Sequence, residues 1–223
     1  YLRTIFGGLS YTRSERLQDD SLQSESLNFR VFFFNQTNDT AMISCTRETE
    51  GLISPFTILR RRAPGENVVI DPGIYEFNRC RAQLRLGSQR KLSGSIAYES
   101  GGFYDGDRAS LQPNISWRPS EHFSLSVSSS INDIELPEGN FTTRLTRLTT
   151  EVVFSSTLSW VNLIQWDNGS DILGINSRLH WVPQAGRDFY LVLNHNLQDL
   201  DENGSFHSTR GDLTAKASYT FRF

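Results

Sequence analysis

A period-two alternation of apolar and polar residues recurs along almost the whole chain and limits what the chain can fold into. Segment 213–223 shows the pattern most clearly, because its odd-numbered residues are apolar or aromatic and its even-numbered residues are hydroxylic or cationic. Successive side chains of a β-strand point to opposite faces, so such a segment forms a strand with one apolar and one polar face. A sustained period of 3.6 residues is absent from the sequence, and we therefore expect an all-β fold with few helices.

The predicted strands, about twelve in number, are joined by connections that alternate in length. Short turns are predicted at residues 36–39, 87–90, 119–121, 155–157 and 183–187. Longer loops are predicted at residues 12–25, 49–72, 101–107, 133–140, 167–171 and 201–204. Short turns at one end of the strands and longer loops at the other are typical of antiparallel up-and-down β-barrels of the bacterial outer membrane. A soluble β-sandwich is the alternative, but it gives no reason for every second connection to be short.

One irregularity is predicted inside the strand that covers residues 75–86. Tyr75 and Phe77 are out of phase with the apolar set that begins at Cys80 and Ala82. An extra residue in one strand would restore the phase, so we expect a β-bulge near Asn78.

Aromatic residues gather at both ends of the predicted strands. Those at the short-turn ends are Trp117, Phe123, Phe154, Trp160, Trp181, Phe189, Phe221 and Phe223. Those toward the other ends are Tyr75, Phe77, Tyr98 and Trp166. Two such bands match the aromatic girdles that membrane barrels place at the two interfaces of the bilayer. We therefore expect residues 1–223 to form a single transmembrane barrel domain, with the lipid bilayer as its partner.

Composition agrees with this expectation and excludes other classes. The net charge of −3 and the pI of about 5.8 give no support for a nucleic-acid partner. The mean hydropathy of −0.41 comes with no apolar run near the ~18 residues that a transmembrane helix needs. A barrel needs only one apolar face per strand, so a low mean hydropathy is compatible with it.

The carboxy-terminal strand ends on Tyr219, Phe221 and Phe223. In outer-membrane barrels a terminal aromatic residue is part of the signal that the insertion machinery binds, and the last strand ends in the periplasm. We expect the same here, which places the short turns on the periplasmic side. An ordinary edge strand at a chain end is the alternative for this stretch alone.

The candidate functional residues are charged side chains on the polar faces of the strands. The densest group is Arg79, Arg81 and Arg85, to which Arg178, Lys216 and Arg222 add further cations. Such residues could line an anion path, because rings of like charge set the selectivity of pores. The favoured alternative is that they pair with Glu151 and other interior acids and make the wall rigid.

The sequence predicts no enzyme and no cofactor. Its four histidines, His122, His180, His195 and His207, are not part of a GxSxG or HExxH motif. Cys45 and Cys80 lack the CxxC spacing of a zinc site. They lie on separate predicted strands. Two unpaired cysteines are favoured, and a disulfide across strands in an oxidising periplasm is the alternative. Calcium binding by the Asp-rich loops is a weaker alternative to plain turns.

Several motifs also resemble a known family. They are Gly102-Phe-Tyr-Asp-Gly106, Trp117-Arg-Pro-Ser-Glu-His-Phe-Ser-Leu125, Asn140-Phe-Thr-Thr143, Asn176-Ser-Arg-Leu-His-Trp181 and Gly186-Arg-Asp-Phe-Tyr-Leu-Val-Leu-Asn194. Together they make residues 74–223 similar to the C-terminal barrel region of large bacterial outer-membrane proteins of unassigned function. In those proteins the barrel follows a domain similar to family 9 carbohydrate-binding modules. The resemblance implies an outer-membrane location and a link to carbohydrate through that N-terminal domain, and it supplies no catalytic residues.

Two functional hypotheses follow. The first is a pore or transport barrel associated with carbohydrate uptake, and the second is a non-conducting barrel that anchors a carbohydrate-binding domain. We also expect the chain to be the C-terminal part of a larger barrel, because residues 1–6 begin directly with a strand-like pattern. The alternative is a twelve-stranded barrel closed between residues 1–11 and 213–223.

Overall fold

The computed structural model of the chain describes residues 2–59, 67–199 and 204–220. Its strands are β1 (Leu2–Glu15), β2 (Leu22–Asn35), β3 (Thr40–Leu52), β4 (Phe56–Leu59), β5 (Val68–Ile70), β6 (Gly73–Arg85), β7 (Leu92–Phe103), β8 (Gly106–Ser120), β9 (Phe123–Leu136), β10 (Gly139–Ser155), β11 (Leu158–Asp167), β12 (Ile172–Gln184), β13 (Arg187–Asp199) and β14 (Phe206–Tyr219).

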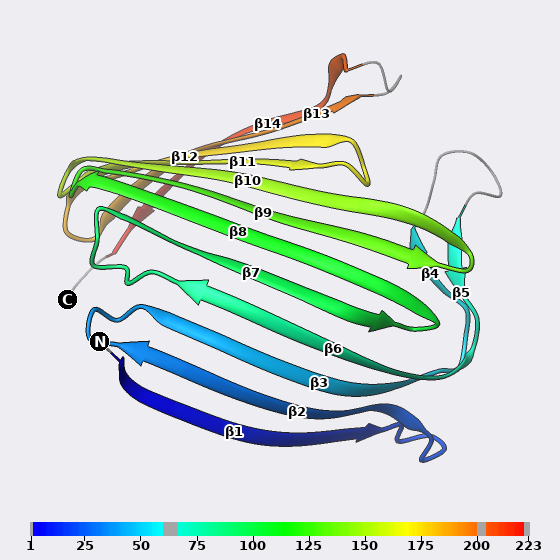
Figure 1. Cartoon of the computed structure of the whole chain (residues 1–223). Coiled ribbons are helices and arrows are strands. Elements are labelled where there is room, and N and C mark those ends of the chain that lie inside the picture. Colours follow the sequence, from blue (N-terminus) through cyan, green and yellow to red (C-terminus); the bar gives the residue numbers. More distant parts are fainter. Residues whose placement is uncertain (1, 60–66, 200–203, 221–223) are drawn as a thin grey trace. The chain divides into compact units, whose positions relative to one another are not determined.

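Twelve of these strands form one antiparallel sheet in the order β1-β2-β3-β6-β7-β8-β9-β10-β11-β12-β13-β14, and β4 and β5 form a separate two-stranded sheet (Figure 1). Each long strand therefore pairs with its neighbour in the sequence, apart from the β4–β5 hairpin inserted between β3 and β6. The predicted all-β, up-and-down order of about twelve strands is confirmed, and the described residues include no helix. Because β1 and β14 are the two end strands of this order, closure into a barrel stays a prediction.

No helix among the described residues is long and apolar enough to cross a membrane. The chain divides into two compact units. Unit 1 comprises residues 1–87, 95–113 and 130–143, and unit 2 comprises residues 88–94, 114–129 and 144–223. Strands β7, β8, β9 and β10 each contribute a segment to both units.

The strands of unit 1 have the two faces that the alternation predicts. Their register brings apolar residues together in rows across the sheet, such as Leu9–Phe29–Cys45–Cys80 and Ile5–Phe33–Ala41–Leu84–Ile96. The large side chains of this apolar face are exposed, with Leu9 at 71% and Leu84 at 60%. The opposite, polar face carries the row Gly8–Arg30–Ser44–Arg81–Glu99, although Phe6, Phe32 and Phe34 also lie on it.

The buried hydrophobic core of unit 1 lies on its polar face, under the β4–β5 hairpin. Val68 and Ile70 of β5 pack with Ile134 and Leu136 of β9, and all four are almost completely buried. Partly buried residues packed against this cluster are Leu52, Ile58, Leu59, Tyr75, Phe103, Tyr104 and Phe141. The sequence predicted only a long loop at 49–72, because strands of three or four residues are too short for a period of two to be recognised.

Unit 2 shows the same separation of faces. One face carries the row Val152–Trp160–Leu179–Leu191–Ala215, and the other carries Glu151–Val161–Arg178–Val192–Thr214. On the apolar face Trp181 is 47% exposed and Leu213 is 69% exposed. The alternation that the sequence predicts for Leu179 and His180 is therefore present in the pairing of β12.

The predicted β-bulge near Asn78 is wrong on the side of β6 that pairs with β3. The ladder runs without a register shift from Thr49–Glu76 through Arg47–Asn78 to Cys45–Cys80. Tyr75 and Phe77 therefore share the polar face with Arg79, whose guanidinium carbon lies 5.0 Å from the centre of the Phe77 ring. These aromatic rings lie on the polar face because they pack against the ring of Tyr104. The strand does not change phase.

The predicted alternation of short and long connections holds only in part. A connection is present at each predicted short turn, at residues 36–39, 86–91, 121–122, 156–157 and 185–186. The long loops predicted at 101–107 and 133–140 are instead mostly strand, and only residues 104–105 and 137–138 connect β7 to β8 and β9 to β10. The backbone ladder continues where the apolar alternation stops, with Gly101 and Gly139 in the left-handed region at φ +145° and +146°.

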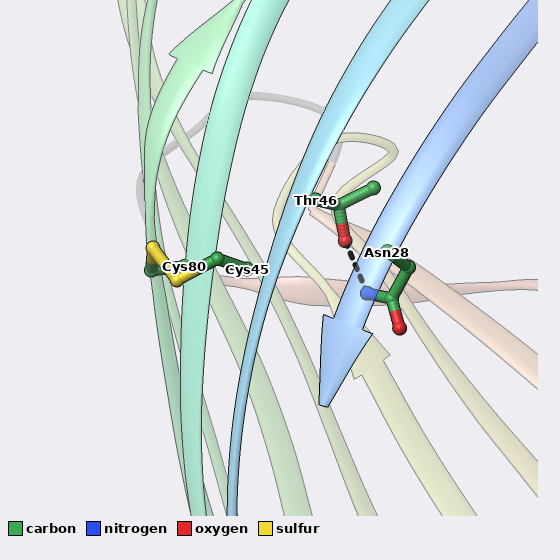
Figure 2. Close-up of a disulfide and its surroundings, with 4 residues drawn as sticks. All are labelled: Asn28, Cys45, Thr46 and Cys80. Carbon is green, nitrogen blue, oxygen red and sulfur yellow. Dashed lines mark hydrogen bonds between the residues drawn. A yellow bond between two sulfur atoms is a disulfide. The ribbon is translucent and has the colours of Figure 1, made fainter. Parts of the chain in front are cut away.

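The expectation of two unpaired cysteines is also wrong. Cys45 and Cys80 form a disulfide between β3 and β6, with 4.1 Å between their Cα atoms (Figure 2). Thr46, the next residue along β3, points to the other face and accepts a hydrogen bond from the Asn28 side-chain amide of β2. Cysteines on different strands can pair when the register places them directly opposite each other, and this register could not be read from the sequence.

Candidate functional site

The candidate site is a charged network on the polar face of unit 1, built on β6. Arg79 and Arg81 are two residues apart on this strand and so point to the same face. In the register Arg79 lies opposite Thr46 of β3, and Arg81 lies opposite Glu99 of β7. Glu48 of β3 is two residues from Thr46 and is therefore a diagonal neighbour of Arg79.

Glu99 is the centre of the network. One of its carboxylate oxygens is 4.0 Å from Nε of Arg79 and the other is 3.7 Å from Nη1 of Arg81. Arg108 of β8 also forms an ion pair and a hydrogen bond with Glu99, and Arg79 does so with Glu48. Three guanidinium groups thus share two carboxylates in direct ion pairs.

Neutral side chains extend the network along β8. Nη2 of Arg81 donates to Oε1 of Gln112 at 2.9 Å, and Nε2 of Gln112 donates to Oγ of the buried Ser110 at 3.2 Å. The guanidinium carbon of Arg108 lies 5.0 Å from the centre of the Phe103 ring, and its buried Nε lacks a hydrogen-bond partner within the described parts of the chain. The arginines are therefore held by several neighbours at once.

Tyr104 lies in the turn between β7 and β8, next to the charged network. It is in the left-handed region at φ 55°, and its ring packs edge-on against Tyr75 and Phe103, with ring centres 5.3 and 4.9 Å apart. Burial raises the pKa of the Tyr104 hydroxyl, and its hydrogen bond with the Glu50 side chain acts in the same direction. The hydroxyl therefore stays protonated at neutral pH and acts as a neutral polar group beside the arginines.

The charged side chains of the network are mostly buried, which favours a fixed arrangement. The side chains of Arg79 and Glu99 are 15% and 20% exposed, so solvent screens this pair much less than an exposed pair. By contrast, the Arg47–Glu76 pair on the opposite face of β3 and β6 is 66% and 59% exposed. The network can hold β3, β6, β7 and β8 of unit 1 in register.

The remaining residues predicted for the site lie elsewhere. Arg85 is at the far end of β6, opposite Thr40 and Ser95. Glu151 and Arg178 belong to unit 2, where both lie opposite Val161 in adjacent ladders. Lys216 lies on the polar face of β14, opposite Tyr190.

The predicted insertion signal is described only in part. Tyr219 ends β14, is 53% exposed, and lies with its ring centre 5.2 Å from the guanidinium carbon of Arg187. Phe221, Arg222 and Phe223 lie outside the described residues.

Sequence reasoning missed the acids that pair with the arginines and also missed Arg108. Glu48, Glu99 and Arg108 each lie in phase with the polar face of their strand, which is a signal that the sequence does contain. What the sequence lacks is the register between β3, β6, β7 and β8, and a shift of two residues would pair each arginine with a different partner.

A second polar contact occurs in unit 2. Nε2 of His180 lies 3.0 Å from Oδ1 of Asp188, and the His180 ring stacks on Tyr190 with 4.2 Å between ring centres. Ser159 lies opposite His180 in the β11–β12 ladder, but the hydrogen bond of the imidazole is to Asp188. No group of three or more His, Cys, Asp or Glu residues in the described parts of the chain could hold a metal ion.

Comparison with known proteins gives no match to this chain among protein-family models, curated proteins or solved structures.

Proposed function

We propose that this chain is a β-barrel of the bacterial outer membrane whose polar face lines a path for small solutes. The observation that carries the proposal is the exposed apolar face of the sheet in each unit. Leu9, Phe29 and Ile43 are each more than half exposed in unit 1, as is Leu213 in unit 2. Soluble proteins rarely leave large continuous apolar surfaces in water, whereas a bilayer covers such a surface.

The lengths of the strands support the proposal. The twelve strands of the sheet have 10 to 17 residues each. A tilted strand needs about 9–11 residues to cross the hydrocarbon layer. Each strand of the sheet is therefore long enough to span a bilayer, and most would extend beyond it at one end.

The disulfide between Cys45 and Cys80 supports a location outside the cytoplasm. Disulfides form and persist in oxidising compartments such as the periplasm and at the cell surface, and they are rare in the reducing cytosol. The pair joins two neighbouring strands of the sheet.

The charged network supports a path with a preference for anions. Three guanidinium groups and two carboxylates lie together on the polar face of unit 1. Arginine side chains that line a path favour anions over cations, as charged rings do in known pores. The link to carbohydrate uptake rests on the resemblance of residues 74–223 alone.

A non-conducting anchoring barrel is the second candidate, and one observation favours it. The β4–β5 hairpin packs Val68 and Ile70 onto the polar face of unit 1, where apolar side chains fill space that a wide channel would leave to water. A filled interior stabilises a small barrel but conducts nothing.

Conductance across a planar bilayer separates the two candidates. The full-length protein, extracted from membranes in detergent, is added to one side of a bilayer in potassium chloride. A pore predicts discrete current steps and a reversal potential that favours chloride, and Arg81→Gln should shift that potential toward potassium. Protein that inserts and gives no steps supports the anchoring barrel and contradicts the pore.

A further inference from the structure

We propose that the polar face of unit 2 carries a binding site for a neutral saccharide, in a depression centred on Gly174. The site lies on β11, β12 and β13, and the charged network described above lies in unit 1. This inference rests on the proposed function, because a path for small solutes would bring the ligand to this face. It adds to that function the class of solute and the residues that hold it.

The depression exists because the middle of the three strands lacks a side chain at its centre. In the register Gly174 of β12 lies between Gln165 of β11 and Asn196 of β13. The open space has a volume of about 360 Å³. A Cβ atom added at Gly174 would point into it, 3.5 Å from Oδ1 of Asn196.

The amide of Gln165 has a fixed orientation. Arg147 of β10 directs Nε and Nη2 at Oε1 of Gln165, at 3.4 and 3.1 Å. A guanidinium group has donors and no acceptor, so the carbonyl oxygen of Gln165 must face it. The NH₂ group of Gln165 is then left as a donor for another partner.

The neighbouring row supplies both a donor and an acceptor. Nδ2 of Asn176 donates to Oδ1 of Asn194 across the β12–β13 ladder. This bond leaves the carbonyl oxygen of Asn176 as an acceptor and the NH₂ group of Asn194 as a donor. The amide of Asn196, next along the same face of β13, lines the depression as well.

The charged groups around the depression are already engaged. The carboxylate of Asp167 accepts hydrogen bonds from the Gly169 backbone and from the Ser170 hydroxyl, each at 2.9 Å. Arg147 is bound to Gln165, and Arg210 of β14, which lies opposite Asn196, is paired with Asp212 at 2.8 Å. Asp167 is the one ionisable residue among those that line the depression, and the amides of Gln165, Asn176, Asn194 and Asn196 supply most of its polar side-chain groups.

A saccharide fits this arrangement better than an ion does. Each sugar hydroxyl both donates and accepts, and a planar amide can bind two neighbouring hydroxyls at once. Leu163 and Ile172 also line the depression and offer apolar surface to the C–H face of a sugar ring. Sites of this kind combine apolar walls with a few placed polar groups.

The test measures binding of neutral hexasaccharides, namely maltohexaose, cellohexaose and chitohexaose, to the detergent-solubilised full-length protein by isothermal titration. Gly174→Leu fills the depression, and Asn196→Leu removes an amide of similar size. Val192→Leu adds volume to the same polar face of β13 outside the depression and is the matched control. Retention of the Cys45–Cys80 disulfide and of the native electrophoretic mobility checks that each variant folds.

We expect at least one hexasaccharide to bind the native protein and the control variant equally. We expect roughly tenfold weaker binding or complete loss in Gly174→Leu and in Asn196→Leu. Native protein that binds none of them, or two site variants that bind as well as the native protein, would overturn the inference. Conductance without saccharide binding would leave the proposed pore intact, and saccharide binding lost in Gly174→Leu without conductance would leave the site intact.

Discussion

Cys45 of β3 and Cys80 of β6 lie directly opposite each other in an antiparallel ladder and are joined by a disulfide (Figure 2). They lie on the apolar face of unit 1, in phase with Ile43 and Ala82. The bond therefore fixes the register of two strands whose connection is interrupted by the β4–β5 hairpin. Disulfides of this kind form and persist in oxidising compartments.

The disulfide predicts that neither cysteine reacts with an alkylating reagent when the unreduced protein is denatured. The bond closes a loop with a sequence separation of 35 residues, for which the chain-entropy estimate is about 3–4 kcal/mol of stability. The double variant Cys45→Ala/Cys80→Ala should lose about that much in denaturant unfolding. Mass spectrometry that finds both thiols alkylated without reduction would refute the pairing.

Removal of the single negative charge of Glu99 should have a large effect on the free energy of unfolding. In Glu99→Gln three guanidinium groups lose a shared carboxylate in a site that is mostly shielded from solvent. We expect a loss of about 2 kcal/mol or more in the free energy of unfolding, measured by urea titration in detergent micelles.

Glu76→Gln is the matched control for Glu99→Gln. Glu76 pairs with Arg47 at 2.8 Å, but both side chains are exposed, and such pairs contribute less than about 1 kcal/mol. Equal losses in the two variants would show that the network around Glu99 does not stabilise the fold.

A methyl group added at Gly101 should disrupt the pairing of β6 with β7. A Cβ atom there would lie 2.2 Å from the carbonyl oxygen of Asn78, and the backbone has φ +145°. Gly101→Ala should therefore cost more than about 2 kcal/mol. Gly8→Ala, whose nearest neighbour would be 3.8 Å away, should change stability by less than about 0.5 kcal/mol. Similar unfolding midpoints for both variants would contradict this backbone geometry.

Leu125 and Ser126 test which face of β9 meets lipid. They are adjacent on the strand and so point to opposite faces. If the apolar face meets the bilayer, Leu125→Arg should cost ~2–4 kcal/mol near mid-membrane and lower the amount of assembled protein in the outer membrane. Ser126→Arg should assemble at close to the native level. Equal assembly of the two variants would reject the assignment of faces.

Much of the fold could be predicted from the sequence because the period of two is a local signal. The alternation around Leu179 and His180, for example, depends only on neighbouring residues and is found in the structure. The positions at which the strands end depend less on neighbouring residues in the sequence. Backbone pairing extends β7 to Phe103 and begins β8 at Gly106, past the point where side-chain alternation stops.

The site could be predicted only in part, because it depends on register between separate strands. The position of Arg79 and Arg81 on the polar face is readable along one segment, whereas their partners Glu48 and Glu99 come from two other strands. The two wrong predictions, of unpaired cysteines and of a bulge near Asn78, have the same cause. Each is decided by which residue lies opposite, and a shift of one residue would exchange the two faces of a strand.

Labelling of intact cells tests most directly the central claim that the sheet spans the outer membrane. Asp105 lies in the turn between β7 and β8, and Glu121 lies in the turn between β8 and β9, so β8 separates the two. Both residues are exposed, and the native cysteines are paired. A membrane-impermeant maleimide should label Asp105→Cys on intact cells and label Glu121→Cys only after the outer membrane is permeabilised. Labelling of both variants on intact cells, or of Glu121→Cys alone, would contradict the account.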